Sequence, residues 1–459
     1  MKISVAGTGF ASFICIKYLV GIGIKPIVFD LDNEISEENK IAIKSESIVK
    51  QKNYDKYICL GGLSNIWTGV IEKYSENDFL KWPINKNDLE PYYDDVLKFL
   101  NFAEVHSFYS SSNDDFLDYK IKKTNNLSKK EIYKDEKFSV QFASLLTNQL
   151  IDSEKNNLHY NNLVPFSISK EINKLIKDSK IDFRREKISK VSENANSVLI
   201  ETLTKENQKK SFECDYLFVG CGTISTYQIM KNSFKNIEDN LRIKSSKKVV
   251  FPVKFLNIKN FEKKFFNTFP IAQIKGLDNK NFSIYSQIYN LNPNIINYIF
   301  PKLNNFKKYL FLFGLFKKFG FSYFGLGSDF SDEFTINNNN DVKIFEKKLK
   351  SSEIVSLCKN LFNKNFINNQ ILHLNIPFKM KPLSGNHFGA VFPMTKNKKK
   401  FFESDTFGRI GDLKKISIND SSIFSSLSSC PPTLTILANS LRITKEVVKN
   451  NFFGAPGRS

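Results

Sequence analysis

Cysteine and histidine are scarce in this chain and are widely spaced. Its 459 residues include four histidines and six cysteines, and no two cysteines form a C-x-x-C pair. The usual spacings of structural zinc sites are therefore absent, and we expect no metal centre. Cysteines without a disulfide pattern favour a reducing compartment. The cysteines are Cys15, Cys59, Cys214, Cys221, Cys358 and Cys430.

Long apolar runs are also missing. No stretch of about 18 apolar residues occurs, so we expect no membrane-spanning helix. Met1 and Lys2 lead directly into an apolar strand-like stretch, without the basic region, apolar region and cleavage site of a signal peptide. We therefore expect a cytoplasmic protein.

Acidic residues are outnumbered by basic ones, which gives a formal net charge of +20. The lysines are scattered and accompany abundant Asn, Ile and Phe, so a solvated surface explains the charge. No zinc-finger spacing or basic heptad is present, and we expect no nucleic-acid partner. Residues 299–325 combine aromatics with lysine pairs. Two core segments with exposed lysines are favoured there over a peripheral contact with a membrane surface.

A glycine-rich turn stands near the start of the chain. Residues 2–32 predict strand, turn, helix and strand, which is a βαβ unit with a parallel sheet. Gly7 permits the tight turn, and Gly9 allows a diphosphate to approach the backbone. Ser12 stands where a small residue lets helix and strand pack closely. The pattern predicts a dinucleotide on the amide groups at the helix start.

Asp30 ends the second strand of this unit, 21 residues after Gly9. A carboxylate at this place accepts hydrogen bonds from both ribose hydroxyls and repels a 2′-phosphate. FAD and NAD both fit these residues, and NADP is disfavoured.

Other segments predict local structure. Residues 82–100 predict a turn and a helix, with Asn87 or Asp88 as its N-cap and Pro91 in its first turn. Residues 181–220 predict strands with a polar hairpin at 205–207. CGTISTYQIMKN then predicts a second glycine turn that begins a helix, at Gly222.

Residues 61–69, GGLSNIWTG, complete a set of motifs that resembles the glucose–methanol–choline (GMC) oxidoreductases, a family of FAD-dependent alcohol and sugar oxidases and dehydrogenases. The resemblance spans the fingerprint and residues 61–93, 181–233 and 385–445. It implies flavin contacts from Gly62, Ser64 and Asn65. This loop is closest to that of pyranose oxidases, which carry a flavin-linked histidine near the place of Ile66. Ile66 implies non-covalent FAD.

The same resemblance implies further cofactor residues. Val191 matches a position that packs against adenine, and Gly222 lies in the turn that closes the FAD domain. Asp420 begins the D-x-S turn beside the ribityl and diphosphate groups. Thr433 lies in the turn that directs backbone amides at the flavin ring.

His387 matches the catalytic histidine of the family, with Met394 seven residues later. The second catalytic residue, His or Asn, is replaced by Pro431. Asn386 and Asn439 are near in sequence, and nothing in the sequence shows that either takes its place. His373 lies in an alternating run, and we expect it to face the site wall or solvent. The family's Gly and Thr after the histidine are Ala390 and Val391 here.

The implied fold class is α/β, with a discontinuous Rossmann-type FAD-binding domain and an inserted α+β substrate domain on an antiparallel sheet. The FAD-binding domain takes residues 1–100, 170–245 and 385–459. Residues 101–169 connect, and residues 246–384 bind substrate.

Three functions remain open. The first is FAD-dependent oxidation of the CH–OH group of an alcohol or sugar by hydride transfer, with His387 as base and an unassigned electron acceptor. The second is an FAD-binding protein whose redox activity is lost or redirected, because Pro431 lacks a polar side chain. The third is a membrane-surface protein built on a nucleotide-binding fold.

Overall fold

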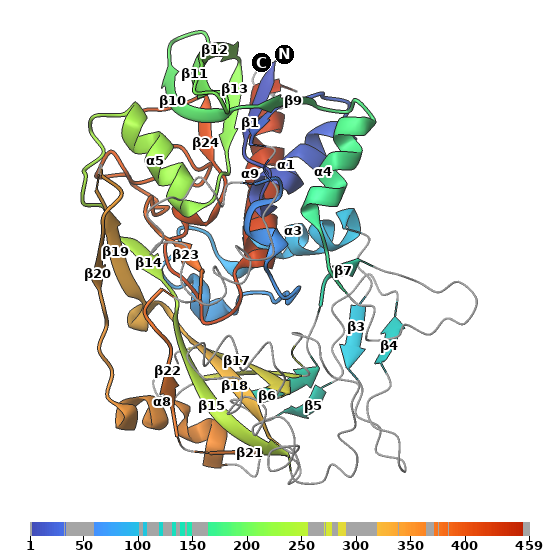
Figure 1. Cartoon of the computed structure of the whole chain (residues 1–459), viewed down its shortest axis with the longest axis vertical. Helices are drawn as coiled ribbons and strands as arrows, with labels where there is room; N and C mark the ends of the chain where they lie inside the picture. Colours follow the sequence, from blue (N-terminus) through green and yellow to red (C-terminus); the bar gives the residue numbers. More distant parts are fainter. Residues whose placement is uncertain are drawn as a thin grey trace.

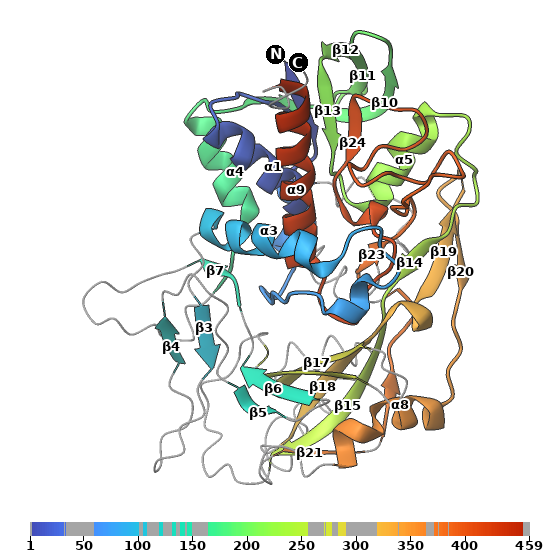
Figure 2. The same ribbon diagram turned by 180° about the vertical axis from the view of Figure 1, so that it is seen from behind.

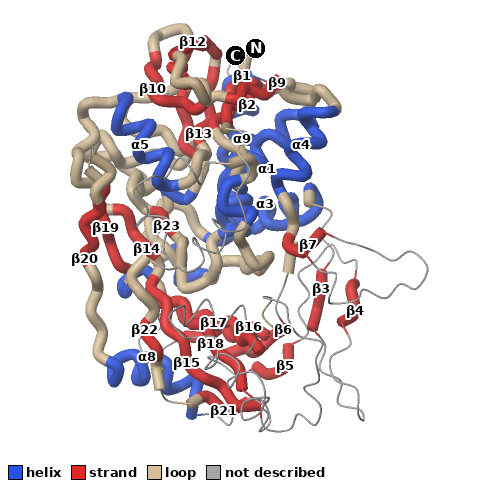
Figure 3. The backbone as a smooth tube through the Cα atoms, in the orientation of Figure 1, coloured by secondary structure: helices blue, strands red, loops and turns tan. Residues whose placement is uncertain are grey.

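Helices gather around one sheet in the upper part of the molecule, and strands dominate the lower part (Figure 3). Figures 1 and 2 show the upper, parallel sheet and the lower, antiparallel sheet from two sides. The predicted mixed α/β class is thus confirmed. The computed structural model describes residues 2–31, 33, 59–100, 104–107, 119–122, 131–134, 138–142, 145–148, 164–255, 270, 272–277, 283–290, 319–337, 339–363, 371–374, 376–383 and 385–452.

A five-stranded parallel sheet forms the centre of the upper part. Every residue of β1, β2 and β13 is buried, as expected for strands covered on both faces. The strands come from sections of the chain that are far apart in sequence. In spatial order they are β24 (Ile416–Ile418), β13 (Tyr216–Val219), β1 (Ile3–Ala6), β2 (Ile27–Asp30) and β9 (Asp182–Arg185).

Four helices pack together beside this sheet (Figure 2). α1 lies along α9, α4 contacts α1, and α3 contacts α9. They are α1 (Phe10–Gly21), α3 (Lys86–Phe99), α4 (Ile168–Lys177) and α9 (Thr433–Phe452). A fifth helix, α5 (Thr223–Ser233), packs on the first strand of a three-stranded antiparallel sheet. That sheet is β10 (Lys187–Glu193), β11 (Val198–Leu203) and β12 (Lys209–Cys214), which confirms the predicted strands and hairpin.

Helix α3 begins earlier than predicted. Its N-cap is Asn85, whose side chain accepts a hydrogen bond from the Asp88 amide at 3.1 Å. The Asp88 carboxylate accepts one from the Asn85 amide at 2.8 Å. This reciprocal capping box satisfies two amides at the helix start. The expected N-cap at Asn87 or Asp88 is therefore wrong, and Pro91 lies inside the helix.

The lower part is built on an eight-stranded antiparallel sheet. Its path is β21 (Ile371–His373), β15 (Lys247–Phe255), β18 (Phe319–Leu326), β17 (Ser283–Asn290), β16 (Ala272–Leu277), β6 (Phe138–Phe142) and β5 (Glu131–Lys134), with β22 (Phe378–Lys379) beside β15. Helix α8 (Ser351–Asn363) belongs to this part (Figure 1).

A four-stranded antiparallel sheet lies between the two parts. Its order is β20 (Val342–Phe345), β19 (Asp332–Ile336), β14 (Ile243–Ser245) and β23 (Phe388–Gly389). Only Ser246 separates β14 from β15, so this strand runs from one part into the other. The pairing of β14 with β23 therefore places residue 387 at the junction of the two parts.

No helix in the described ranges combines the length and apolar character needed to cross a membrane. The aromatic and lysine-rich segment 299–325 is described only from residue 319, where β18 begins. Phe321 and Phe324 of that strand are buried. Residues 299–318 lie outside the described residues.

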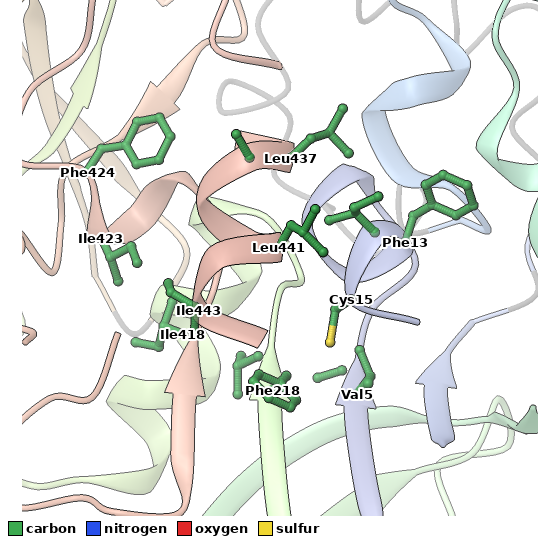
Figure 4. Packing of buried hydrophobic residues seen from close by; sticks show 14 of the residues in the cluster. Val5, Phe13, Cys15, Phe218, Ile418, Ile423, Phe424, Leu437, Leu441 and Ile443 are labelled. Atoms are coloured by element: carbon green, nitrogen blue, oxygen red, sulfur yellow. The ribbon is translucent and has the colours of Figure 1, made fainter. Parts of the chain in front are cut away.

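The main hydrophobic core lies between the parallel sheet and helices α1 and α9. Figure 4 shows Val5 and Phe218 of the sheet beside Leu441 of α9, and all three are fully buried. Burying one such side chain contributes about 1.5–3 kcal/mol relative to leaving it exposed. The packing holds the starts of both helices near the same edge of the sheet.

Candidate functional site

The carboxyl ends of four parallel strands carry predicted nucleotide-binding residues. Gly7 follows β1, Asp30 ends β2, Gly222 follows β13 and Asp420 follows β24. Because the strands are parallel, these residues lie along one edge of the sheet (Figure 1). Ligands of open α/β sheets bind in crevices at this edge.

The two glycines of the turn after β1 differ in their backbone conformation and in what surrounds them. Gly7 has a φ of +85°, and a Cβ there would lie 3.0 Å from both the Cys221 Cα and the Gly220 carbonyl oxygen. Gly9 has a φ of −67°, and a Cβ there would meet no described heavy atom within 4 Å. No side chain caps α1, and its first turn has no acidic residue. Among the described residues its first amides therefore have no side-chain partner, as at anion-binding helix starts.

Ser12 takes the place of the small third residue of the fingerprint. Its Oγ donates a hydrogen bond to the Ala6 carbonyl at 2.8 Å and also lies 3.1 Å from the Gly220 carbonyl. A Cβ on Gly220 would clash with this Oγ and would lie 2.6 Å from Asn419 Oδ1. Ser12 thus holds α1 against the ends of β1 and β13.

The Asp30 carboxylate is buried and accepts hydrogen bonds from its own chain. Thr8 Oγ1 donates to Oδ2 at 2.5 Å, and the Leu31 amide donates to Oδ1 at 2.7 Å. The Thr8 hydroxyl accepts a bond from the Gly61 amide at 2.8 Å. A carboxylate has about four acceptor sites, so ribose hydroxyls can still be bound. The bonds through Thr8 also connect the fingerprint turn to the second glycine loop.

That second loop contains the 3₁₀ helix η3 (Gly62–Asn65) and lies against the fingerprint turn. Gly61 and Gly62 have φ values of +81° and +54°, and a Cβ on Gly62 would lie 3.8 Å from Gly9 Cα. Ser64 Oγ donates to the Gly61 carbonyl at 2.7 Å. Asn65 Nδ2 donates to the Gly62 carbonyl at 2.9 Å. The side chains of Ser64 and Asn65 therefore hold the shape of this loop.

The turn after β13 is joined to the turn after β24 by one carboxylate. The Gly222 amide and Thr226 Oγ1 donate to Asp420 Oδ2 at 2.9 and 2.5 Å. The amide and hydroxyl of Ser422 donate to Oδ1 at 2.9 and 2.5 Å. Burial raises the pKa of Asp420, and these hydrogen bonds oppose the shift. Gly222 has a φ of +82°, and a Cβ there would meet no described atom within 4 Å.

His387 lies one residue before β23, and hydrogen bonds attach this strand to both turns. Thr223 Oγ1 and Ser421 Oγ each donate to the Phe388 carbonyl at 2.9 Å. The His387 carbonyl accepts a bond from the Ser246 amide at 3.1 Å. The fold thus places the predicted base next to the ends of β13 and β24.

The His387 imidazole is largely enclosed by protein. Its pKa is held well below 6.5, first because burial removes solvation and second because Lys248 is positively charged. Within the described part of the chain, Nδ1 has no hydrogen-bond partner. The ring is therefore neutral at pH 7 and can accept a proton, as a general base must.

Lys248 is close enough to His387 for its charge to lower the pKa of the imidazole, and no sequence pattern predicted this. It pairs with Gly325 in the register of β15 and β18 and is 6% exposed. A Cβ on Gly385 would lie 3.1 Å from Lys248 Cγ and Cε. Burial lowers the pKa of Lys248 to about 8. The sequence feature that could have indicated this site is a lysine at the start of an apolar strand. Because Lys247 precedes it, however, the pair looks like two ordinary surface lysines.

Helix α9 begins beyond the level of α1. The two helices run in the same direction, because Ser440 Oγ donates to the Ala11 carbonyl at 2.7 Å and Lys445 Nζ lies 5.8 Å from the Tyr18 ring centroid. Thr433, the first residue of α9, precedes Ser440 by roughly 10 Å of helix. The start of α9 therefore projects past the edge of the parallel sheet.

Pro431 precedes this helix start, is buried and has no polar side-chain atom. Asn439 lies roughly 9 Å further along α9. Its Oδ1 accepts a hydrogen bond from Arg442 Nη2 at 2.9 Å. Asn439 is thus held by its own helix, away from the place of Pro431. Asn386 precedes His387 with a φ of +50°.

Other predicted positions lie in the core. Val191 of β10 and Met394 are each 1% exposed, and the Val191 amide donates to Ser233 Oγ at 2.8 Å. The contacts of Val191 and Thr433 with a cofactor stay predictions. In the described ranges, no group of three or more His, Cys, Asp or Glu side chains could hold a metal ion.

His373 lies on the far face of the antiparallel sheet. It pairs with Val253, which is five residues after Lys248, so the side chains of His373 and Lys248 point to opposite faces. His373 is buried, its ring centroid lies 6.1 Å from that of Phe324, and burial lowers its pKa to about 3. The expectation that it faces the site wall or solvent is therefore wrong.

Comparison with known proteins shows the fold. No protein-family model matches the sequence, and no curated protein matches it. Many solved structures match, and two of them each have a TM-score of 0.59 and 10% identity. One is pyridoxine 4-oxidase from Mesorbium loti, with 97% of this chain and 98% of that chain covered. The other is an FAD-dependent oxidoreductase from Chaetomium thermophilum in complex with a small-molecule fragment, with 99% and 100% covered. The chain shares the fold of these proteins.

Proposed function

We propose that this protein binds FAD without a covalent bond and oxidises a CH–OH group, with His387 as the base. The position of His387 carries the proposal. Its neutral ring belongs to the residue just before β23, the strand that Thr223 and Ser421 attach to the turns at the proposed nucleotide-binding edge. The fold shared with a protein described as an FAD-dependent oxidoreductase supports the same function.

The glycine turns fit the shape of a dinucleotide. A Cβ on Gly9 or Gly222 would meet no described heavy atom within 4 Å, and no described side chain caps the helix that begins there. The amides there can bind the diphosphate, and Asp30 can accept bonds from ribose hydroxyls. Gly62 lies against Gly9 and leaves room above the same turn. Ile66 has no nucleophilic atom, so FAD is held non-covalently.

We assign the domains as the motifs imply. Residues 1–100, 170–245 and 385–459 form a discontinuous Rossmann-type FAD-binding domain, which is supported by the origin of the five parallel strands. Residues 246–384 form the substrate domain. Residues 101–169 connect the two and add β5 and β6 to the antiparallel sheet.

Oxidation of an alcohol removes a proton from the hydroxyl and a hydride from the same carbon, which leaves a carbonyl. FAD supplies the hydride acceptor. His387 accepts the hydroxyl proton, and its low pKa keeps the accepting nitrogen free before reaction. The electron acceptor that completes turnover is left open.

The antiparallel sheet favours a polar substrate, such as a sugar or another hydroxylated alcohol. Tyr285 pairs with Gly325, so it shares the face of the sheet that carries Lys248. The Tyr285 hydroxyl donates to Gln273 Oε1 at 2.9 Å, and the Gln273 amide donates to Glu72. Such a row of side chains can exchange hydrogen bonds with hydroxyl groups.

The test begins with the flavin. Purified protein is expected to show flavin absorption, and alcohols or sugars added without oxygen are expected to bleach it. His387→Ala is expected to keep the flavin and lose about 10²–10⁴-fold in kcat/KM. A colourless protein that does not take up FAD would contradict the proposal.

Pro431 supports one alternative, an FAD-binding protein whose redox activity is lost or redirected. Such a protein would be yellow but would not bleach with any alcohol or sugar in a broad panel. Unchanged turnover after His387→Ala would also favour this alternative.

A further inference from the structure

We propose that the ammonium group of Lys248 holds the substrate oxygen and replaces the second polar side chain that Pro431 does not supply. This proposal rests on the proposed function. In the enzymes that the sequence resembles, a side chain from the segment before α9 holds the substrate oxygen. Here we assign that role to a residue of β15 in the lower sheet.

Glycines from two distant segments make room for this side chain. The Cβ position of Gly325 lies 3.0 Å from Lys248 Nζ, and that of Gly385 lies 3.1 Å from Cγ and Cε. A larger residue at either place would push the lysine away. The stem is therefore confined, and its end is held at a defined place in the site.

The same Gly325 position places Lys248 beside the segment that contains Pro431. A Cβ on Gly325 would clash with the Ser429 carbonyl oxygen and would lie close to Lys248 Nζ. Ser429 precedes Pro431 by two residues. Lys248 is also close enough to His387 for its charge to lower the pKa of the imidazole. The ammonium group is thus near both the proposed base and the segment that contains Pro431.

No opposite charge balances Lys248 in the described part of the chain. Its Nζ makes no hydrogen bond or ion pair there, and its nearest aromatic ring is Tyr323, with the centroid at 5.9 Å. Burial raises the pKa of the adjacent Cys430 thiol to about 12, so it is neutral. By contrast, the buried Lys247 lies 2.7 Å from Asp332 Oδ1.

A buried cation without a partner is costly to maintain, and such groups are concentrated at functional sites. The substrate supplies the missing partner. When His387 accepts the hydroxyl proton, negative charge develops on the substrate oxygen. A hydrogen bond from Lys248 Nζ stabilises that charge, and Lys248 keeps its own proton throughout.

The test compares Lys248→Met with Lys254→Met, a matched change six residues later on the same strand. Lys254→Met is expected to behave as the unchanged protein. Lys248→Met is expected to keep its FAD and to lose about 10²–10³-fold in kcat/KM, as when one oxyanion donor is removed. If Lys248→Met binds FAD and keeps kcat/KM within threefold, the proposal is overturned and the proposed function stands.

A second measurement needs neither flavin nor turnover. After reductive methylation with ¹³C-formaldehyde, the Lys248 resonance, identified by its absence in Lys248→Met, is expected to titrate near pH 8 in flavin-free protein. Titration near pH 10.4, the ordinary lysine value, would contradict the buried and unbalanced charge.

A third variant covers the case in which Lys248→Met does not fold. Lys248→Ala leaves a space that a small alkylammonium ion can enter. Ethylammonium is expected to restore at least tenfold of the lost kcat/KM, while the larger tetraethylammonium ion restores none. Failure of ethylammonium to restore activity in a flavin-loaded Lys248→Ala protein would count against the proposal.

Discussion

The Gly222 amide donates a hydrogen bond of 2.9 Å to Asp420 Oδ2, and this bond joins residues that are 198 positions apart. Thr226 and Ser422 add further donors to the same carboxylate. Asp420, which the family resemblance assigns to the cofactor site, thus also holds together the turns that follow β13 and β24. Its effect on cofactor binding is expected to act through this connection.

Replacing Asp420 by Asn tests that connection. The amide nitrogen of Asn would face hydrogen-bond donors, so we expect a loss of about 1–3 kcal/mol in the free energy of unfolding. Urea denaturation measures the loss. Asp412→Asn changes an exposed carboxylate nearby and is expected to have little effect. Equal stability of the two variants would show that the bonds to Asp420 contribute nothing.

Alanine substitutions at two glycines near the carboxyl ends of the parallel strands are expected to differ in their effects on stability and on FAD binding. Gly9→Ala places a methyl group in open space at an ordinary φ, so the melting temperature should barely change. FAD binding should be lost, because the methyl group would occupy the path of the diphosphate. Gly220→Ala forces its methyl group against Ser12 Oγ and Asn419, so stability itself should fall. Thermal unfolding and FAD titration of both variants check this contrast.

Ala390 stands where the enzymes that the sequence resembles have glycine, and its backbone conformation is one that favours glycine. Its φ is +58°, a left-handed conformation that costs a residue with a Cβ roughly 1–2 kcal/mol. Part of this is offset by the greater freedom of glycine in the unfolded chain. Ala390→Gly is therefore expected to stabilise the protein by about 0.5–1 kcal/mol. Ala438→Gly, inside helix α9, should have the opposite sign.

The dependence of kcat/KM on pH follows from the two pKa shifts in the site. His387 acts as the neutral form, and its pKa lies well below 6.5, so activity should not fall as pH decreases to 6.5. Lys248 acts as the protonated form, so activity should decline as pH rises through about 8. Lys248→Met should remove the alkaline decline and move any acidic decline upward, because the charge that lowers the pKa of His387 is gone. If the alkaline decline persists in this variant, a group other than Lys248 causes it.

Local patterns were enough to predict the glycine turns and the helices and strands that flank them. Gly7 needs a positive φ, and α1 follows β1 directly, so neighbouring residues determine this conformation. The N-cap of α3 was misplaced because Asn85, Asn87 and Asp88 are all good N-caps. Only the geometry of the helix start distinguishes them.

His373 and Lys248 could not be placed from sequence for a different reason. Alternation in a strand shows which residues share a face, but it does not show which face meets the site. That choice depends on how the antiparallel sheet packs against the segment before α9.

The sequence by itself determined the fingerprint, the open helix start at Gly9 and the mixed α/β class, because each depends on residues that are close in the chain. The tertiary structure decided the surroundings of His387. Its neighbours come from strands and turns that lie as many as 198 positions apart, and burial among them sets its protonation. The unbalanced charge of Lys248 likewise exists only because Gly325 and Gly385, 60 positions apart, leave it room in a buried place.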